Sequence, residues 1–349
     1  MTQFIIGWDI GGAHVKAALL TQEGALNNLA LQACPLWKGL DYLQRAVQAI
    51  ERQFATQSCQ HAITMTGELV DLFDNRVQGV EAIVGAMHAL LPNSSVMIYA
   101  GDQGFITPSM IDPAQCLKIA SANWLASAHF VAAQVSNAVF VDIGSTTTDI
   151  LLIENHALNA VGYTDYQRLV SDELVYTGIV RTAVMAVAPQ AVFKQQKMSL
   201  MAEFFATMAD VYRVSGDLND AHDLSDTADG GPKTQVASAR RLSRMTGYDF
   251  DENDMALWRD FSKDIKTQQK TRIMQAITRQ LARSRQQDIS LVGAGIGRFL
   301  VKEIAQEMGH HYIDFDNLIE TNRPQNALHS SDCAPAVAVA KLALQSSLV

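Results

Sequence analysis

The sequence predicts an α/β protein of two similar domains, and three observations support this prediction. Residues 8–19 and 141–152 repeat each other at an offset of 133 residues, so that Asp9 falls on Asp142. Strand-like and helix-like apolar patterns alternate around both copies. The length of 349 residues also suits two domains of about 100–200 residues each. Because 133 residues is too long for a solenoid repeat, we expect two domains that face a central cleft.

Each copy of the repeat predicts a β-hairpin. Strands are expected at 4–8 and 15–20 in the first copy, and at 138–141 and 148–153 in the second. An Asp-x-Gly-x turn joins the two strands in each copy.

The rest of the chain reads as strands alternating with helices. We expect strands at 61–66, 95–99 and 289–292, and helices at 40–54, 80–91, 119–133, 172–188, 200–213, 236–245, 254–281, 298–308 and 334–344. The expected domains are 1–135 and 136–330, the second with a helical insertion at about 195–285. A C-terminal helix in 331–349 is expected to pack back on the first domain.

Composition excludes several classes of protein. The net charge of −9 opposes binding to nucleic acid or anionic lipid. No run approaches the roughly 20 apolar residues of a membrane helix, and the N-terminal apolar run is too short for a signal peptide. The cysteines, with no C-x-x-C spacing, favour reduced thiols; they are Cys34, Cys59, Cys116 and Cys333. We therefore expect a cytoplasmic protein, and the sequence leaves a homo-oligomer open.

The two turns have the composition of anion sites. Glycine allows the backbone to approach a ligand, and successive turn amides form a concavity that suits phosphate. The predicted phosphate-binding residues are Gly11, Gly12, His14, Lys16, Gly144, Ser145, Thr146 and Thr147. Either turn alone would be interpreted as a tight connection between core strands, but two copies at matching places favour a site.

Carboxylates end the first strand of each hairpin. Asp9 and Asp142 would repel a phosphate directly, but they suit Mg²⁺, which prefers carboxylate oxygens, water and substrate phosphates. We therefore predict that these two residues hold the metal. Asp149 is a further candidate near the same place, and Glu68 follows another predicted strand. As single carboxylates, Glu68 and Asp102 would more often be turn or cap residues.

A third glycine turn lies near the C-terminus. Gly293, Gly295 and Gly297 join a predicted strand to a predicted helix, whose N-terminal amides suit a phosphate or nucleotide. Their G-x-G-x-G spacing differs from the dinucleotide fingerprint.

The predicted insertion contains acidic and basic residues in regular patterns. Asp217, Asp220, Asp223, Asp226 and Asp229 recur every third residue, which favours a solvated acidic loop over a metal site. Arg241 and Arg244 could bind a substrate carboxylate, or they could form the charged outer face of a helix.

The two hairpins and the late glycine turn resemble the phosphate 1, phosphate 2 and adenosine motifs of the acetate/sugar kinase–heat-shock–actin superfamily. Within it, the chain resembles the hydantoinase/oxoprolinase group, and more narrowly the tetrahydromethanopterin-linked one-carbon proteins related to the archaeal methanofuran-biosynthesis condensing enzymes. Further supporting stretches are 65–71, 119–124, 172–182, 209–213, 228–234 and 237–245. This resemblance implies two ribonuclease H-like (actin-like ATPase) domains.

The resemblance also implies a transferase. Such an enzyme joins a furanylmethyl diphosphate to the phenol of γ-glutamyltyramine and releases diphosphate. Its partners would be these small molecules, the diphosphate and the phenolic amine. The phosphate cradle, with Mg²⁺, would hold the substrate's diphosphate, so ATP is possible but not required. Glu68 or Asp149 would take the phenol proton.

Two alternatives stay open at this point. One is an ATP-dependent small-molecule kinase or an oxoprolinase-like ATPase, in which Asp102 resembles the strand-end base of sugar kinases. The other is a nucleotide-gated scaffold without small-molecule chemistry.

Overall fold

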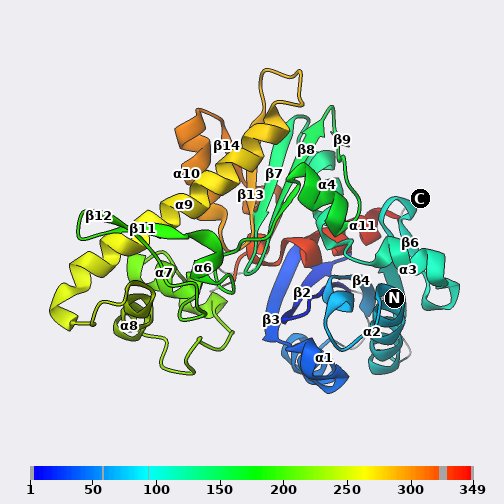
Figure 1. The fold of residues 1–349 in the computed structure, drawn as a ribbon. Helices are drawn as coiled ribbons and strands as arrows, with labels where there is room; N and C mark the ends of the chain where they lie inside the picture. Colours follow the sequence, from blue (N-terminus) through cyan, green and yellow to red (C-terminus); the bar gives the residue numbers. More distant parts are fainter. Residues whose placement is uncertain (1–3, 57–58, 93, 322–327, 347–349) are drawn as a thin grey trace. The chain divides into compact units, whose positions relative to one another are not determined.

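The structure is a computed structural model that describes residues 4–56, 59–92, 94–321 and 328–346. The chain divides into two compact units (Figure 1). One comprises residues 1–137, 153–159 and 314–349, and the other comprises residues 138–152 and 160–313. The domain boundaries expected at 135 and 330 stay predictions.

The first unit is built on a sheet of strand order β3-β2-β1-β4-β5-β6. Its strands are β1 (Phe4–Ile10), β2 (His14–Thr21), β3 (Leu26–Ala33), β4 (Cys59–Met65), β5 (Ser95–Tyr99) and β6 (Phe105–Ile106). Strand β2 is antiparallel to β1 and β3, whereas β1, β4 and β5 run parallel. This order, with its second strand reversed, is that of a ribonuclease H-like domain. Parallel pairing brings the carboxyl ends of β1, β4 and β5 to one edge of the sheet.

Helices cover both faces of this sheet. They are α1 (Leu40–Phe54), α2 (Arg76–Leu90), α3 (Pro113–Ile119), α4 (Asn123–Gln134) and α11 (Ala334–Ser346). Because side chains alternate along a strand, Ile6, Trp8 and Ile10 of β1 pack in one cluster with α1 and α2. Gly7 lies on the opposite face, where α11 packs on β1 so closely that a Cβ at position 7 would overlap the carbonyl oxygen of Ala336.

The second unit contains a sheet of order β10-β8-β7-β13-β14. Its strands are β7 (Ala138–Ile143), β8 (Thr148–Glu154), β10 (Leu174–Val175), β13 (Ser290–Ala294) and β14 (Tyr312–Asp314), with β9 (Ala157–Leu158) pairing with β8. Strands β7 and β13 are parallel, as β1 and β4 are. The order repeats β3-β2-β1-β4-β5, and the predicted pair of ribonuclease H-like domains is therefore confirmed.

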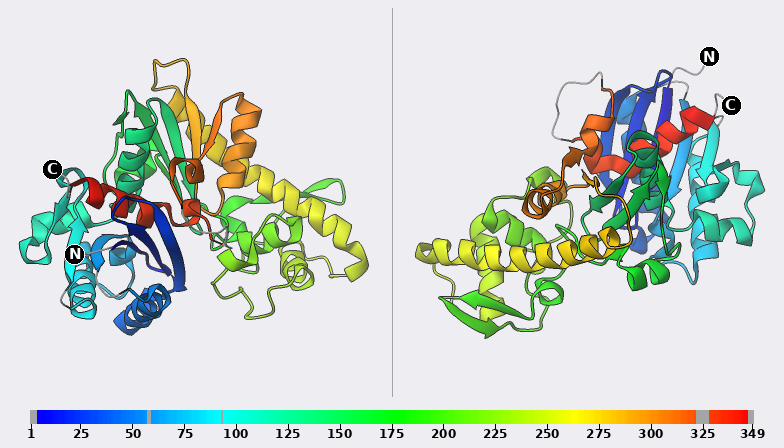
Figure 2. Two further views of the ribbon diagram at one scale, coloured as in Figure 1. Left: turned by 180° about the vertical axis from the view of Figure 1, so that it is seen from behind. Right: turned by 90° about the horizontal axis from the view of Figure 1, so that it is seen from above.

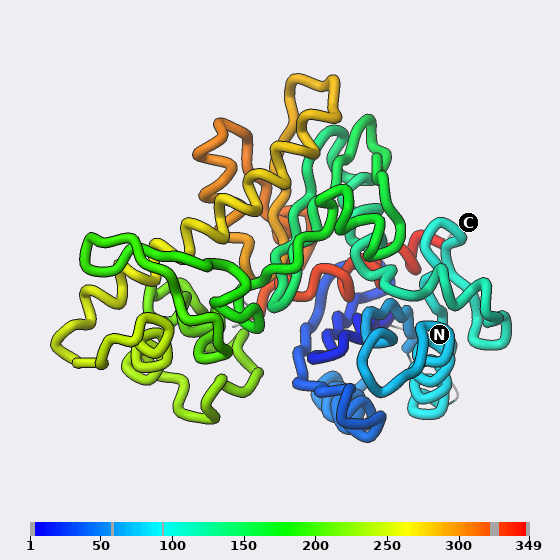
Figure 3. Tube along the Cα trace, viewed as in Figure 1, coloured from blue at the N-terminus to red at the C-terminus, as the bar shows by residue number. Residues whose placement is uncertain are grey.

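A helical region is inserted between β10 and β13. The helices of this unit are α5 (Asp165–Ser171), α6 (Val184–Val187), α7 (Met208–Ser215), α8 (Gln235–Thr246), α9 (Met255–Leu281) and α10 (Arg298–Met308). The long helix α9 extends along the unit (Figure 2). A small hairpin of β11 (Gln190–Phe193) and β12 (Gln196–Ser199) packs beside it, as the trace also shows (Figure 3). Phe193 stacks on Trp258 of α9, with ring centroids 4.8 Å apart.

Three predicted helices are wrong in extent. The helix expected at 119–133 is interrupted between α3 and α4, where Ser121 takes a left-handed φ of 53°. The segment 172–188 forms β10, an irregular stretch and the short α6 instead of one helix. Within 200–213 the helix begins only after Thr207, whose side chain forms a capping box with Asp210. Helical apolar spacing alone does not reveal such breaks. The first two accompany contacts with distant residues, whereas the third is a local cap at Thr207.

The structure bears on two expectations drawn from composition, which concern the cysteines and membrane helices. The four cysteines are free thiols. Among the residues that the structure describes, no helix combines the length and the apolar character needed to cross a membrane.

His61 of β4 is buried in the core of the first unit beside Trp8 of β1. The Trp8 Nε1–H donates to His61 Nδ1 at 3.0 Å, which leaves the imidazole neutral with its proton on Nε2. Burial lowers the pKa of His61 to about 4. The unfolded chain, with a His pKa near ~6.5, therefore takes up a proton before the folded chain does as the pH falls.

This pKa difference predicts an acid-sensitive core. The contribution of His61 to stability is complete above pH ~6.5 and decreases as the pH falls toward 4. Between pH 7 and pH 5 the free energy of unfolding should decrease by about 2 kcal/mol more in the native protein than in His61→Gln. Denaturant titrations at both pH values measure this difference. Equal decreases in the two proteins would contradict the assignment.

Candidate phosphate-binding site

The turn between β1 and β2 is held through its carbonyl groups. The Gly11 amide closes the turn on the His14 carbonyl at 2.9 Å. The carbonyls of Gly12 and Ala13 accept hydrogen bonds from the following segment, Gly12 from Leu36 at 3.0 Å and Ala13 from Cys34 at 2.8 Å. The segment just after β3 therefore fixes the carbonyl groups of this turn.

The turn between β7 and β8 is held in the same way. The Gly144 amide closes it on the Thr147 carbonyl at 2.9 Å. The segment Thr177–Thr182, called here the strap, supplies the donors. The amides of Ile179, Val180 and Arg181 donate to the turn carbonyls, at 3.0 Å to Gly144 and at 3.1 and 2.8 Å to Ser145.

The two turns leave equivalent amides available. Within residues 4–56, 59–92, 94–321 and 328–346, the amides of Gly12, Ala13, Ser145 and Thr146 donate to no other residue. These positions correspond at the repeat offset of 133 residues. Successive amides of this kind form an anion-binding nest. Each hairpin thus has two successive amides without an acceptor in the described part of the chain, which is the feature that the predicted phosphate site needs.

Lys16 and Asp9 lie opposite each other in the β1–β2 ladder. Asp9 is 5% exposed, and its Oδ1 accepts a hydrogen bond from Asn123 Nδ2 at 3.3 Å. His14 begins β2, and both His14 and Lys16 are half-buried. The first hairpin therefore brings a carboxylate and a cation close to its turn.

Asp142 lies beside the third glycine turn. Gly295 takes a φ of 78°, and a Cβ at this position would overlap Asp142 Oδ1. The Gly297 amide donates to the Ile143 carbonyl at 2.9 Å, and helix α10 begins at the next residue. Gly293 packs against the ring of Tyr312. Glycine at positions 295 and 297 thus allows the β13–α10 turn to pack closely on the end of β7, and glycine at position 293 allows the Tyr312 ring to pack on β13.

The two carboxylates predicted as bases differ in their partners. Glu68 is 1% exposed and accepts a hydrogen bond from the Ser121 hydroxyl at 2.8 Å. Asp149 forms an ion pair with the buried guanidinium of Arg168. Since removing one partner of a buried ion pair leaves the other charge uncompensated, Asp149 contributes to the structure of the second unit.

Arg241 belongs to a buried ion-pair network in the insertion. Its side chain is 1% exposed and contacts Asp210 at 2.7 Å and Asp229 at 3.0 Å. The prediction that Arg241 binds a substrate carboxylate is not supported by this placement, because two protein carboxylates already occupy its guanidinium. Arg244, 46% exposed, contacts Asp229 at 3.4 Å.

Four of the five aspartates in the stretch 217–229 are exposed, as expected for a solvated loop, and Asp223 is the exception. Asp223 is buried and pairs with Arg213 and Lys233. Asp217 contacts Lys266 of α9 at 3.2 Å. Basic residues outside the stretch thus neutralise Asp217 and Asp223, which the acidic pattern alone does not reveal.

The motifs assign no role to several residues near the predicted site, although Ser121 and Asn123 lie in the stretch 119–124 that supports the family resemblance. Ser121 and Asn123 flank the break between α3 and α4 and contact Glu68 and Asp9. A second group lies at the end of β5, where the Tyr99 hydroxyl is 2.8 Å from His129 Nδ1 and His129 Nε2 is 3.6 Å from Asp102. Ser121 and Asn123 interrupt an otherwise apolar stretch, and this interruption is the local signal for the first pair.

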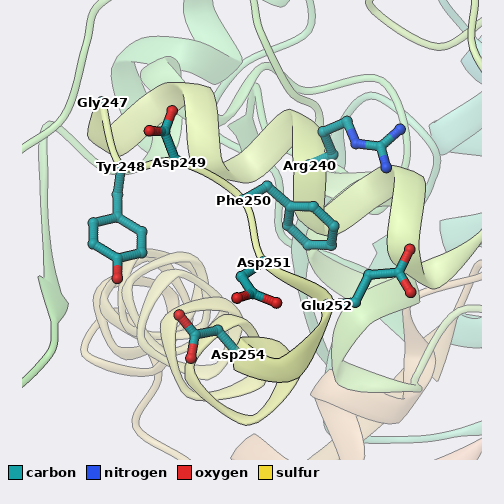
Figure 4. A pocket seen from close by; sticks show the side chains of 8 residues that line it. All are labelled: Arg240, Gly247, Tyr248, Asp249, Phe250, Asp251, Glu252 and Asp254. Atoms are coloured by element: carbon teal, nitrogen blue, oxygen red, sulfur yellow. The ribbon is translucent and has the colours of Figure 1, made fainter.

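The insertion also contains an open hollow of about 700 Å³, formed by Arg240 of α8 and the loop that leads from α8 to α9 (Figure 4). It is lined by Arg240, Gly247, Tyr248, Asp249, Phe250, Asp251, Glu252 and Asp254. The Arg240 guanidinium lies 5.3 Å from the centroid of the Phe250 ring. None of the predicted site residues lines this hollow.

Each hairpin, taken by itself, has one carboxylate beside its turn, a donor of the kind that suits a hydrated magnesium ion. In the described part of the chain, no group of three or more His, Cys, Asp or Glu side chains is arranged to hold a metal. Mg²⁺ at phosphate sites commonly takes only one or two carboxylates and completes its shell with water and substrate phosphates. Asp9 and Asp142 each adjoin a turn with available amides, and Gly295 leaves room for the second carboxylate.

Comparisons with known proteins identify the family. Residues 60–345 match the family model described as hydantoinase/oxoprolinase. The (4-{4-[2-(gamma-L-glutamylamino)ethyl]phenoxymethyl}furan-2-yl)methanamine synthase of Methanocaldococcus jannaschii is 31% identical over 246 residues, 70% of this chain and 72% of the relative. The synthase of the same name from Methanococcus vannielii is 32% identical over 127 residues, 36% of this chain and 56% of the relative.

Among solved structures, the chain is similar to the activator of the 2-hydroxyisocaproyl-CoA dehydratase from Clostridium difficile with bound ADPNP. The two are 12% identical with a TM-score of 0.48, and the match covers 99% of this chain and 96% of the activator. The family model and the 31% identical synthase confirm the resemblance seen in the sequence. The chain belongs to the hydantoinase/oxoprolinase family.

Proposed function

We propose that this protein is a magnesium-dependent transferase of methanofuran-type cofactor synthesis, serving tetrahydromethanopterin-linked one-carbon metabolism. It joins a furanylmethyl diphosphate to the phenol of γ-glutamyltyramine and releases diphosphate. The printed name of the relatives describes the corresponding product, a phenoxymethylfuran ether that carries a γ-glutamylaminoethyl group. The observation that carries the proposal is the pair of equivalent turns with available amides, in a chain 31% identical to such a synthase.

The reaction requires charge stabilisation at the leaving group. The phenol oxygen forms a bond to the furanylmethyl carbon, the bond from that carbon to the diphosphate oxygen breaks, and the phenol proton passes to a base. Diphosphate leaves easily only when its developing charge is neutralised. In this proposal the amides of Gly12, Ala13, Ser145 and Thr146 bind phosphate oxygens, and Lys16 adds a positive charge.

The carboxylates proposed for magnesium are Asp9 and Asp142. When bound, the ion neutralises charge on the diphosphate and orients it. Asn123 orients the Asp9 carboxylate through its amide nitrogen. Gly295 keeps space beside Asp142 that any larger side chain would fill.

Glu68 is proposed as the base for the phenol proton. Its partner Ser121 is a neutral hydroxyl. Asp149 instead forms an ion pair with the buried guanidinium of Arg168, so its carboxylate already has a cationic partner. The Ser121 hydroxyl holds one oxygen of Glu68 in place.

The direct test is a reaction with purified protein, magnesium, the furanylmethyl diphosphate and γ-glutamyltyramine. We expect the ether by mass spectrometry and one diphosphate released for each ether formed. Asp9→Asn and Asp142→Asn should each abolish most of this turnover, whereas Asp260→Asn, which alters an exposed ion pair with Lys263, should not. Failure to form the ether would overturn the proposal, and ATP-dependent phosphorylation of a small molecule would establish the kinase alternative.

The two candidate bases are separable by mutation. Glu68→Gln should lower kcat by about 10²- to 10⁴-fold, the usual contribution of a general base, with KM little changed. Asp149→Asn should chiefly reduce the free energy of unfolding, by about 3–5 kcal/mol, because Arg168 is left buried without its carboxylate.

Activity and denaturant titrations on the same preparations distinguish these effects. A Glu68→Gln protein with native kcat, or a stable Asp149→Asn protein with its kcat lowered by 10²-fold or more at the chemical step, would reverse the assignment.

A further inference from the structure

The second turn has no basic residue of its own. The position equivalent to Lys16 at the repeat offset is Asp149, whose charge is opposite and which pairs with Arg168. Residues 144–147 are one glycine and three hydroxyl residues. If this turn binds a diphosphate, any side-chain cation that contacts it must come from another segment of the chain.

The strap brings a cation to this turn. Arg181 donates its backbone amide to the Ser145 carbonyl at 2.8 Å, so its Cα is fixed beside the turn. Its Nη1 lies 3.4 Å from the Thr146 hydroxyl, and the side chain is exposed. The guanidinium therefore lies beside the hydroxyls and amides to which the anion site was assigned.

The strap is held firmly against the turn. A Cβ at Gly178 would overlap the Thr146 backbone nitrogen, so only glycine permits this approach. The Thr182 hydroxyl accepts the Gly178 amide at 2.8 Å and lies 3.5 Å from the Thr146 carbonyl. The position of Arg181 is thus set by backbone contacts on both sides of it.

Helix α9 anchors the other end of the strap. Gln269 is fully buried, and its Nε2 donates to Thr177 Oγ1 at 2.7 Å and to the Gly178 carbonyl at 2.9 Å. Its Oε1 accepts the Tyr212 hydroxyl at 2.5 Å. The helical insertion therefore fixes the strap that carries Arg181.

We propose that Arg181 is a phosphate-binding residue, whose guanidinium binds a diphosphate group held by the amides of Ser145 and Thr146. A guanidinium matches phosphate geometry with paired N–H donors, which a lysine cannot reproduce. The proposal rests on the proposed function only for the chemical class of the ligand, an ester of diphosphate. Arg181 does for the second turn what Lys16 does for the first.

The test is calorimetric titration with inorganic diphosphate in the presence of magnesium. Arg181→Ala should raise the dissociation constant by about 10- to 100-fold, the loss expected for hydrogen bonds to a charged group. Arg181→Lys should recover part of this loss. The matched control is Arg279→Ala, which removes an exposed arginine of the same unit that pairs with Asp172 at 2.6 Å.

A second variant tests the strap itself. Gly178→Ala retains Arg181 but forces the strap away from Thr146, so it should also weaken diphosphate binding. Gly85→Ala is its control, because no atom lies within 4 Å of a Cβ at that helical position.

The outcomes distinguish the inference from the proposed function. Unchanged diphosphate binding in Arg181→Ala, or no binding by the native protein, would overturn the inference. Ether formation by that same variant with native KM for the furanylmethyl diphosphate would overturn it too. A protein that makes no ether, yet loses diphosphate affinity in Arg181→Ala, would overturn the proposed function and leave the inference intact.

Discussion

The candidate site depends on the hydrogen bonds that hold the carbonyl groups of the two turns. In each hairpin a neighbouring segment donates amides to these carbonyls, at 2.8–3.1 Å. A backbone peptide that is fixed through its carbonyl presents its N–H in a fixed direction. The anion binding that we propose would therefore need no rearrangement of the Ala13, Ser145 and Thr146 amides, which is the condition for effective charge stabilisation. The same contacts explain the close approach of Gly178 and of Gly295 to the second turn and the end of β7.

The two halves use the same backbone with different side chains. The carbonyls of Ile10 and Ile143 correspond at the repeat offset, and each accepts a backbone hydrogen bond. The donor is the Thr66 amide at 3.0 Å in the first half and the Gly297 amide at 2.9 Å in the second. The charges, however, differ. Lys16 stands in the first hairpin where Asp149 stands in the second. Arg168 neutralises Asp149, and the strap supplies a separate cation. A repeat at the level of backbone hydrogen bonds thus permits different roles for the two turns.

The sequence predicts the parts of this structure that depend on local pattern. The helices at 40–54 and 298–308 and the strand at 95–99 begin and end where apolar periodicity places them. The repeat likewise predicts both hairpins and their glycine turns. What it does not predict depends on contacts between distant residues. The helix expected at 172–188 is replaced by the strap because turn carbonyls compete for its amides.

The same distinction applies to the candidate site. The chemistry of phosphate and magnesium binding is the reason for predicting Asp9, Asp142 and the glycine turns as site residues. Their role in binding remains a prediction. Ser121 and Asn123 reach Glu68 and Asp9 only through a left-handed break in an otherwise helical stretch. Arg241 looks like a surface residue in the sequence, but it is buried between two aspartates of the insertion.

The central claim is that the available amides of both turns bind phosphate oxygens. Hydrogen exchange of backbone amides, with and without magnesium diphosphate, tests it most directly. We expect slower exchange at Gly12, Ala13, Ser145 and Thr146 when the ligand is added. Protection at neither turn, or protection confined to the hollow around residues 247–254, would contradict the account.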